Sequence, residues 1–270
     1  MIEALTQVYV AFGQFSYLVI FVLGLILGSF LNSWMWRTRE NFKIFVSSRS
    51  MCVHCHRQLF WWENVPVLSY IYLRGKCLKC KRPIPTRYPL VELCTAVLLV
   101  FIAWYHVRFL PQFELWRWLR DVFYITFLIV IFVYDALYQE ILSRIVWPGV
   151  IIGFCINYFA LGYSAGGMLL AAAVAGGFFL LQYIFSHGTW IGGGDVRLGV
   201  MMGVWLGWPA ILWALFAAYI IGAIVSVFLL ITKKAGPNTA VPFGTFLAIG
   251  TLCAIYQGQA VVGWYLGLLK

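Results

Sequence analysis

Long apolar runs fill most of this chain, and short polar connections separate them. A helix needs about 20 apolar residues to cross the hydrocarbon core of a bilayer. On that scale the pattern predicts eight membrane-spanning helices, near residues 8–35, 88–107, 119–138, 143–163, 165–186, 195–207, 209–232 and 241–267. The sixth is short, because about 13 residues rise only about 20 Å. It is therefore either a partly submerged span or a re-entrant segment.

Composition agrees with the pattern. Hydrophobic residues make up 63% of the chain and charged residues 10%, with a mean hydropathy of +0.89. Soluble domains are about 45–50% apolar and about 25% charged. The sequence therefore predicts an all-α polytopic membrane protein. The first apolar run has no basic segment before it and no small-residue cleavage site after it, which indicates a retained helix rather than a removed signal peptide.

One long polar interval, residues 37–87, lies between the first two predicted spans. It holds eleven of the nineteen basic residues: Arg37, Arg39, Lys43, Arg49, Arg57, Arg74, Lys76, Lys79, Lys81, Arg82 and Arg87. The positive-inside rule makes this loop cytoplasmic and places the N-terminus outside. With eight spans, four more basic residues lie inside (Arg144, Arg197, Lys233, Lys234) and four lie outside (Arg108, Arg117, Arg120, Lys270).

A re-entrant sixth segment would move Lys233 and Lys234 outside, so the charge distribution favours eight spans. The formal net charge of +10 then serves as a topological signal and contacts membrane lipid, which argues against nucleic acid as a partner. Three parts are predicted: a first helix (1–36), a cytoplasmic cysteine-rich loop (37–87) and a seven-helix membrane domain (88–270). Small residues that recur every four residues should let helices pack closely, as at Gly199, Gly203 and Gly207 and at Ala171 and Ala175.

Two C-x2-C pairs lie in the cytoplasmic loop, Cys52 with Cys55 and Cys77 with Cys80. Each pair can form a tight turn that presents both sulfurs to one metal ion, so the spacing predicts a zinc-ribbon-like site. A pair of disulfides is the alternative, and it fits a reducing compartment poorly. His54 and His56 are expected to be solvated loop residues. A four-thiolate site is coordinatively closed, so its expected role is structural.

The nine acidic residues can be sorted by position. Glu3 is terminal, Glu40 and Glu63 lie in the loop, Glu114 and Asp121 are assigned to an outer connection, and Glu92 and Glu140 lie near cytoplasmic helix ends. Asp135 and Asp195 remain, each at the cytoplasmic edge of an apolar span. Two carboxylates that share a desolvated site hold one proton between them, which is the arrangement of aspartic proteases.

Another interpretation of the two aspartates stays open from the residues alone. Asp135 would pair with Arg144 or a lipid headgroup, and Asp195 would cap a helix with Arg197 nearby. The glycines before Asp195, at positions 192, 193 and 194, favour the first interpretation. Gly192, Gly193 and Gly194 would let a substrate backbone approach, and they permit conformations that other residues avoid.

Four stretches together resemble the bacterial type IV prepilin peptidases, also called leader peptidase and N-methyltransferase. They are GSFLN (28–32), the cysteine loop with the helix start that follows it (52–93), GGGDVRLG (192–199) and VPFGTFLAIG (241–250). The resemblance implies a membrane aspartic endopeptidase of the G-x-G-D type in the bacterial cytoplasmic membrane. It implies that Asp135 and Asp195 are catalytic, that Gly192, Gly193 and Gly194 support the catalytic loop, and that the four loop cysteines bind the metal.

The resemblance also implies substrates and a second activity. Such enzymes remove the basic leader from type IV prepilins and type II secretion pseudopilins, and many then methylate the new N-terminus with S-adenosylmethionine. The loop has no glycine-rich dinucleotide fingerprint, so the residues that bind this methyl donor are unknown from the sequence. The chain departs from the family at ILSRI (141–145), where the family commonly has an apolar residue followed by Pro-Asp or Pro-Asn. A proton- or cation-coupled transporter with intramembrane aspartates is the alternative function.

Overall fold

The computed structural model describes residues 2–42, 50–110, 113–233 and 241–268. Of the basic residues used to predict the topology, Lys43, Arg49, Lys234 and Lys270 lie outside this part of the chain. Within it there are helices and no strands, apart from isolated bridges between Met51 and Gln58 and between Lys76 and Pro83. The prediction of an all-α protein is confirmed.

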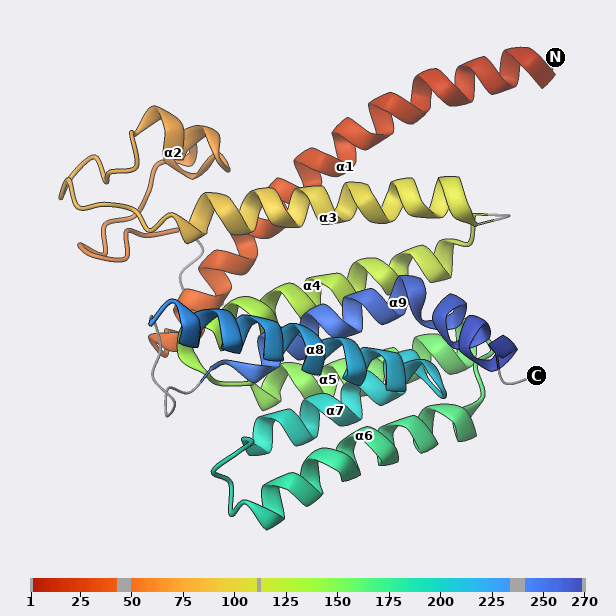
Figure 1. The fold of residues 1–270 in the computed structure, drawn as a ribbon. Helices are drawn as coiled ribbons and strands as arrows, with labels where there is room; N and C mark the ends of the chain where they lie inside the picture. Colours follow the sequence, from red (N-terminus) through yellow and green to blue (C-terminus); the bar gives the residue numbers. More distant parts are fainter. Residues whose placement is uncertain (1, 43–49, 111–112, 234–240, 269–270) are drawn as a thin grey trace. The chain divides into compact units, whose positions relative to one another are not determined.

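The helices follow the predicted apolar runs to within a few residues, apart from an earlier start of the first helix (Figure 1). The long helices are α1 (Ile2–Arg39), α3 (Arg87–Phe109), α4 (Leu115–Tyr138), α5 (Ser143–Cys155) with its π-helical continuation (Ile156–Ala160), α6 (Ala165–Phe185), α7 (Gly193–Leu206), α8 (Ala210–Ile231) and α9 (Phe243–Leu268). The loop after α1 contains a 3-10 turn (Trp61–Asn64) and the short α2 (Leu68–Tyr72). Among the described residues, seven helices are long and apolar enough to cross a membrane, and α7, with 14 residues, is shorter.

Two compact units make up the chain, residues 1–114 and 115–270. The first unit groups α3 with α1 and the cysteine loop, so its boundary differs from the three-part division given above, which stays a prediction. Within this unit Gly24 and Gly28 face α3. A Cβ on Gly28 would lie 2.7 Å from the Cα of Glu92, so only glycine allows this approach of the two helices. Asn32, one turn further on, donates a hydrogen bond of 3.0 Å to the Tyr88 carbonyl.

The second unit encloses α7 between α5, α6 and α9. Leu198, Met201 and Met202 are fully buried, as expected of a helix that is apolar on every side. Gly199 and Gly203 allow the close approach of α6, because a Cβ on Gly203 would overlap the Ala171 and Ala172 backbone. That packing prediction is confirmed for Gly199 and Gly203.

Gly207 has another role. No atom lies within 4 Å of its Cβ position, and its φ of +69° makes it the left-handed residue that ends α7.

The last two helices run antiparallel. A Cβ on Gly222, past the middle of α8, would lie 3.1 Å from Phe246, early in α9, whereas one on Gly258, late in α9, would lie 3.1 Å from Ala210, the first residue of α8. The starts of α7 and α9 line one cavity, so that α7 carries the chain from this end of the unit to the opposite end, where α8 begins. This course fits a short span and not a re-entrant segment.

One assignment from the sequence is wrong. Asp121 does not belong to a connection: it lies inside α4, 3% exposed, and forms an ion pair of 2.8 Å with Arg120. Arg120 also donates a hydrogen bond of 2.9 Å to the Tyr163 hydroxyl. Asp121 can be buried because Arg120 on the same turn neutralises its charge. A hydropathy pattern does not reveal that pairing, so the sequence made Asp121 look exposed.

Candidate functional site

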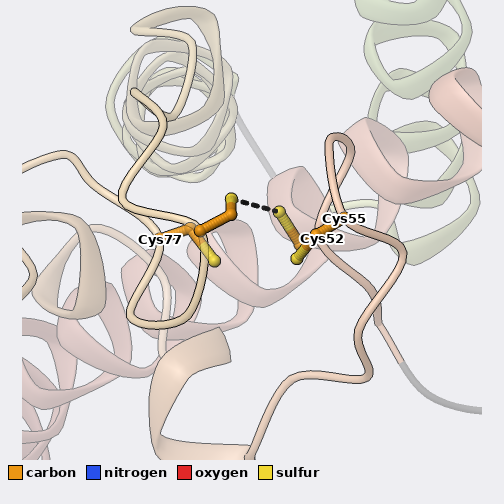
Figure 2. A group of neighbouring side chains, drawn as sticks. Cys52, Cys55 and Cys77 are labelled. Atoms are coloured by element: carbon orange, nitrogen blue, oxygen red, sulfur yellow. Dashed lines mark hydrogen bonds between the residues drawn. The ribbon is translucent and has the colours of Figure 1, made fainter.

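The four loop cysteines converge. Their sulfur atoms all lie within 4.8 Å of one another, and Cys52 Sγ and Cys80 Sγ are 3.9 Å apart. Figure 2 shows Cys52 and Cys55 on one turn facing Cys77 on the other. Tetrahedral zinc with bonds of about 2.3 Å to sulfur has sulfurs about 3.8 Å apart, whereas a disulfide requires about 2.05 Å. The arrangement therefore fits a four-thiolate metal site better than two disulfides.

The two turns that carry these cysteines have the same local structure. In the first, Cys52 N–H donates to the Arg57 carbonyl at 2.9 Å, and in the second, Cys77 N–H donates to the Arg82 carbonyl at 3.0 Å. Each turn closes with a left-handed residue, His56 at φ 53° and Lys81 at φ 58°. This repeat is what two C-x2-C knuckles on one metal require.

The two loop histidines lie outside the sulfur cluster. Both are exposed, as expected. His54 Nε2 lies 3.2 Å from the Pro83 carbonyl and so joins the two knuckles, and the His56 ring lies 6.0 Å from the rings of Trp36 and Phe42.

Charge in the loop supports its fold. Glu63 is 5% exposed and accepts hydrogen bonds from Arg57 Nη1 at 2.9 Å and from the Phe60 N–H at 2.8 Å. Burial alone would raise the pKa of Glu63, but Arg57 and the Phe60 N–H outweigh it and hold this pKa below its ordinary value. The carboxylate thus fixes the segment that follows the first knuckle.

The thiols of the cluster differ in acidity. Burial raises the pKa of Cys52 to about 11. Burial also opposes ionisation of Cys77, but hydrogen bonds from the backbone N–H groups of Cys80 and Lys79 and from neighbouring thiols lower its pKa to about 6. Without a cation, one thiolate forms while its neighbour keeps the proton, because adjacent negative charges repel. A dication removes that repulsion, so the donor set fits a divalent metal.

Asp135 lies near the end of α4 and is 4% exposed. Its Oδ2 accepts a hydrogen bond of 2.9 Å from the N–H of Thr245, the third residue of α9. The carboxylate therefore satisfies one of the free N–H groups that begin every helix. The Thr245 hydroxyl in turn donates to the Pro242 carbonyl at 2.6 Å. Sequence reasoning missed Thr245, and the Pro-x-Gly-Thr pattern at the start of this helix is the signal that could have found it.

Asp195 lies in the first turn of α7 and is 7% exposed. Its Oδ2 accepts a hydrogen bond of 3.1 Å from the Gly192 N–H, whereas its Oδ1 is buried and has no hydrogen-bond partner among the described residues. Arg197 does not pair with it. Its guanidinium binds the Gly193 carbonyl and the Ser143 hydroxyl. Asp195 does cap its own helix, as the alternative interpretation held, but one of its oxygens remains available.

Both aspartates line one cavity of about 640 Å³, and the two carboxyl groups interact electrostatically. Asp135 makes no ion pair with Arg144 in the part of the chain that the structure describes. The structure therefore brings together the two carboxylates that the sequence singled out, from α4 and α7, at the start of α9.

The three positions before Asp195 do not require glycine for its backbone conformation, but one of them requires it for space. None has a positive φ, and Gly192 is extended at φ −79°, so the expected unusual backbone conformation is wrong. Space matters at Gly194, where a Cβ would lie 2.9 Å from the Ile141 side chain. Ile141 also approaches Gly244, whose Cβ position is 2.9 Å from Asp135 Oδ2. Ile141 thus packs against Gly194, next to Asp195, and against Gly244, next to Asp135.

The ILSRI departure has a visible local outcome. α5 begins at Ser143 after Leu142, and no side chain caps it. The Ser143 hydroxyl instead accepts a hydrogen bond from Arg197 of α7. The start of α5 is thereby tied to the helix that carries Asp195.

Fold and site together define a polytopic helical membrane protein with a four-cysteine cluster in one unit and paired buried carboxylates in the other. The family model of the bacterial peptidase A24 N-terminal domain matches residues 22–106, and that of the type IV leader peptidase family matches residues 122–227. The chain belongs to the type IV leader peptidase family.

Relatives match over nearly their whole length. The prepilin leader peptidase/N-methyltransferase of Stutzerimonas stutzeri is 31% identical, covering 91% of this chain and 92% of the relative. Those of Pseudomonas aeruginosa (31% identical; 91% and 91% covered) and Legionella pneumophila (30% identical; 94% and 95% covered) are similar. No solved structure matches the chain significantly.

Proposed function

We propose that this chain cleaves the basic leader from type IV prepilins and type II secretion pseudopilins, and then methylates the new N-terminus with S-adenosylmethionine. The relatives named prepilin leader peptidase/N-methyltransferase support both activities. The enzyme is a multi-pass protein of the bacterial inner membrane. Its N-terminus lies outside and its loop and aspartates face the cytoplasm, because fifteen of its nineteen basic residues then lie inside.

One observation carries the peptidase assignment: Asp135 and Asp195, from different helices, are buried at one cavity. Two carboxylates in such a site share one proton. The ionised carboxylate takes a proton from a water molecule, which attacks the scissile carbonyl carbon, while the protonated one donates its hydrogen bond to the carbonyl oxygen. The tetrahedral intermediate then breaks its C–N bond, and the leaving amine receives a proton from the dyad. Gly192 and Gly193 leave room for the substrate backbone, whereas the space at Gly194 is taken by Ile141.

Zinc is the metal we assign to the cysteine cluster. Cys52, Cys55, Cys77 and Cys80 would hold it, and a four-thiolate site has no open position for water or substrate. When bound, zinc would neutralise the thiolates and fix the two knuckles. It would take no part in peptide cleavage.

Methylation transfers a methyl group from S-adenosylmethionine to the amine that cleavage exposes. The neutral amine nitrogen forms a bond to the methyl carbon, the carbon–sulfur bond breaks with its electron pair passing to sulfur, and the amine releases a proton to solvent. S-adenosylhomocysteine is the second product. The alternative function, a transporter, receives no support from the family or from the relatives.

The test is to incubate purified enzyme with a prepilin, with and without S-adenosylmethionine, and to weigh the product. Loss of the leader reports cleavage, and the added mass of one methyl group reports methylation. Asp135→Asn and Asp195→Asn should each lower the cleavage rate by roughly 10³-fold or more, since each removes a carboxylate that moves a proton.

Glu114→Gln provides the control, because it removes an exposed acidic group from the other unit. Both aspartate variants should still bind one zinc ion per chain. Near-normal cleavage by both of them would overturn the peptidase mechanism.

A further inference from the structure

A second cavity lies within the first unit, between α1, α3 and the cysteine loop. Ser29, Ser33 and Trp36 line it from α1, where their spacing of four and three residues places them on one helix face. Tyr88 and Glu92 line it from the start of α3. Aspartate-dependent proteolysis uses none of these residues, which belong to the other compact unit.

Glu92 is the unusual member of this cavity. Its side chain is 6% exposed, its Oε2 accepts a hydrogen bond of 2.7 Å from the Val67 N–H, and the Ser29 hydroxyl lies against the same carboxylate. No lysine, arginine or histidine pairs with it among the described residues. A buried carboxylate without a cationic partner is costly, and such groups are normally paired.

Glu63, which lines the same cavity, shows what pairing looks like. It is buried to the same degree, 5% exposed, and it binds Arg57 through both carboxylate oxygens. Glu63 is thus satisfied within the protein, whereas Glu92 has only neutral hydrogen-bond donors. A cation that enters from outside would complete the surroundings of Glu92.

We propose that this cavity binds the S-adenosylmethionine of the methylation reaction, with Glu92 opposite the donor's positive charge. The inference rests on the proposed methyltransferase activity. Sulfonium is a permanent cation, so a carboxylate in an apolar cavity attracts it strongly. Trp36, Tyr70 and Tyr88 offer flat apolar surfaces for the adenine ring.

Two further features of the lining fit this ligand. Arg82 forms no hydrogen bond or ion pair through its side chain within the described residues, and a guanidinium is suited to the donor's carboxylate. Cys52 and Cys77 form part of the wall. The metal cluster would therefore shape the donor site without touching the reacting atoms, so loss of the metal should impair methylation.

The test compares two ligands that differ in charge. S-adenosylmethionine carries the sulfonium, and S-adenosylhomocysteine has a neutral sulfur at that position. Binding of each to the full-length protein in detergent is measured by calorimetry. Glu92→Gln keeps the shape and an acceptor for the Val67 N–H but removes the charge. It should weaken S-adenosylmethionine roughly tenfold, which corresponds to about 1.4 kcal/mol, and S-adenosylhomocysteine far less.

A second variant keeps the test decisive if Glu92→Gln folds poorly. Ser33→Leu places a larger side chain in the cavity and should weaken both ligands, whereas Phe30→Leu, on the exposed face of α1, should change neither. Zinc content and thermal unfolding report whether each variant is folded.

The outcomes are distinct. Equal weakening of the binding of both ligands by Glu92→Gln would overturn the role of the charge. Unchanged binding in both Ser33→Leu and Glu92→Gln would overturn the site. In either case, methylation by the wild type would still support the proposed function. A wild type that neither binds the donor nor methylates would overturn the proposed methyltransferase activity and this inference together.

Discussion

The cysteine cluster and the aspartate pair are positioned in different ways. All four cysteines come from one loop, and each pair is held by a turn whose hydrogen bonds join residues five apart. The aspartates come from α4 and α7, and their places depend on the packing of α5, α6 and α9 around those helices. One site is therefore local in sequence, whereas the other depends on the tertiary structure.

This difference determines what should damage each site. A change in helix packing should impair the aspartates and leave the metal in place, whereas loss of the metal should impair the loop and leave the aspartates. The two units also divide the proposed activities, with methylation in the first and cleavage in the second. Variants that affect both activities equally would contradict the division.

Apart from the aspartates themselves, the largest effect is expected at the contact between α6 and α7. Gly203→Ala places a methyl group against the backbone of α6, so the two helices must separate and Asp195 must move. Overpacking of this kind costs about 1–3 kcal/mol or more. Cleavage should fall strongly and the melting temperature should drop, while zinc content stays at one per chain.

Gly177→Ala is the matched control, because it adds the same methyl group to α6 where no atom lies within 4 Å. It should retain cleavage and stability. Equal losses in the two variants would show that close approach at Gly203 does not position Asp195.

Removal of a metal ligand should have the opposite pattern. Cys52→Ser should release the zinc, as measured by metal analysis of the purified protein, and it should impair methylation because the loop loses its cross-link. Cleavage should be reduced less than methylation. Cys94→Ser, at an exposed position on α3 in the same unit, should keep the metal. Full zinc retention by Cys52→Ser would contradict the four-thiolate site.

A smaller effect is expected where α9 meets Asp135. Thr245→Pro removes the N–H that the carboxylate accepts, and proline is tolerated in the first turn of a helix. Cleavage should fall by about tenfold, the equivalent of one hydrogen bond to a charged group. Thr245→Ala keeps the N–H and should lose little. Assays of initial cleavage rates would separate the two, and equal rates would exclude a role for this bond.

The smallest effect is expected in the loop. Glu63→Gln breaks the pair with Arg57 and should lower the free energy of unfolding by about 1–3 kcal/mol at neutral pH. Because the folded pKa of Glu63 lies below its ordinary value of 4.5, the wild-type advantage is complete above that value and is lost as the pH falls through the folded pKa. The difference in melting temperature between the wild type and Glu63→Gln should stay constant from neutral pH to about pH 5 and should narrow below it. Glu40→Gln, at an exposed acid, should show no such difference.

Much of the fold follows from the sequence because a bilayer limits the choices. Apolar run length predicted the long helices, and the spacing of the cysteine pairs predicted the sulfur cluster, since both signals are local. It was harder to predict which residues from different helices lie together. Asp135 and Asp195 could be matched only by elimination, and the hydrogen bond from Thr245 joins residues that no local pattern connects.

The errors have the same origin. Asp121 was placed in a connection because a charged residue near a helix end looks exposed, yet Arg120 on the same turn neutralises it in the interior. The glycines before Asp195 were expected to allow conformations that other residues avoid, but Gly194 matters for the space that Ile141 occupies. Each depends on a neighbour that is known only once the helices are packed.

The two contacts of α9 restrict its rotation about its own axis. Thr245 is fixed by Asp135, and Gly250, five residues on, is fixed by the Ala214 and Ala218 surface of α8. A helix turns by about 100° per residue, so inserting or deleting one residue between these positions would direct the Thr245 N–H away from the carboxylate or turn Gly250 off α8. Helical phase is thus a constraint on this segment that is separate from its hydrophobicity. Substitutions that preserve apolar character should be tolerated there, and changes in length should not.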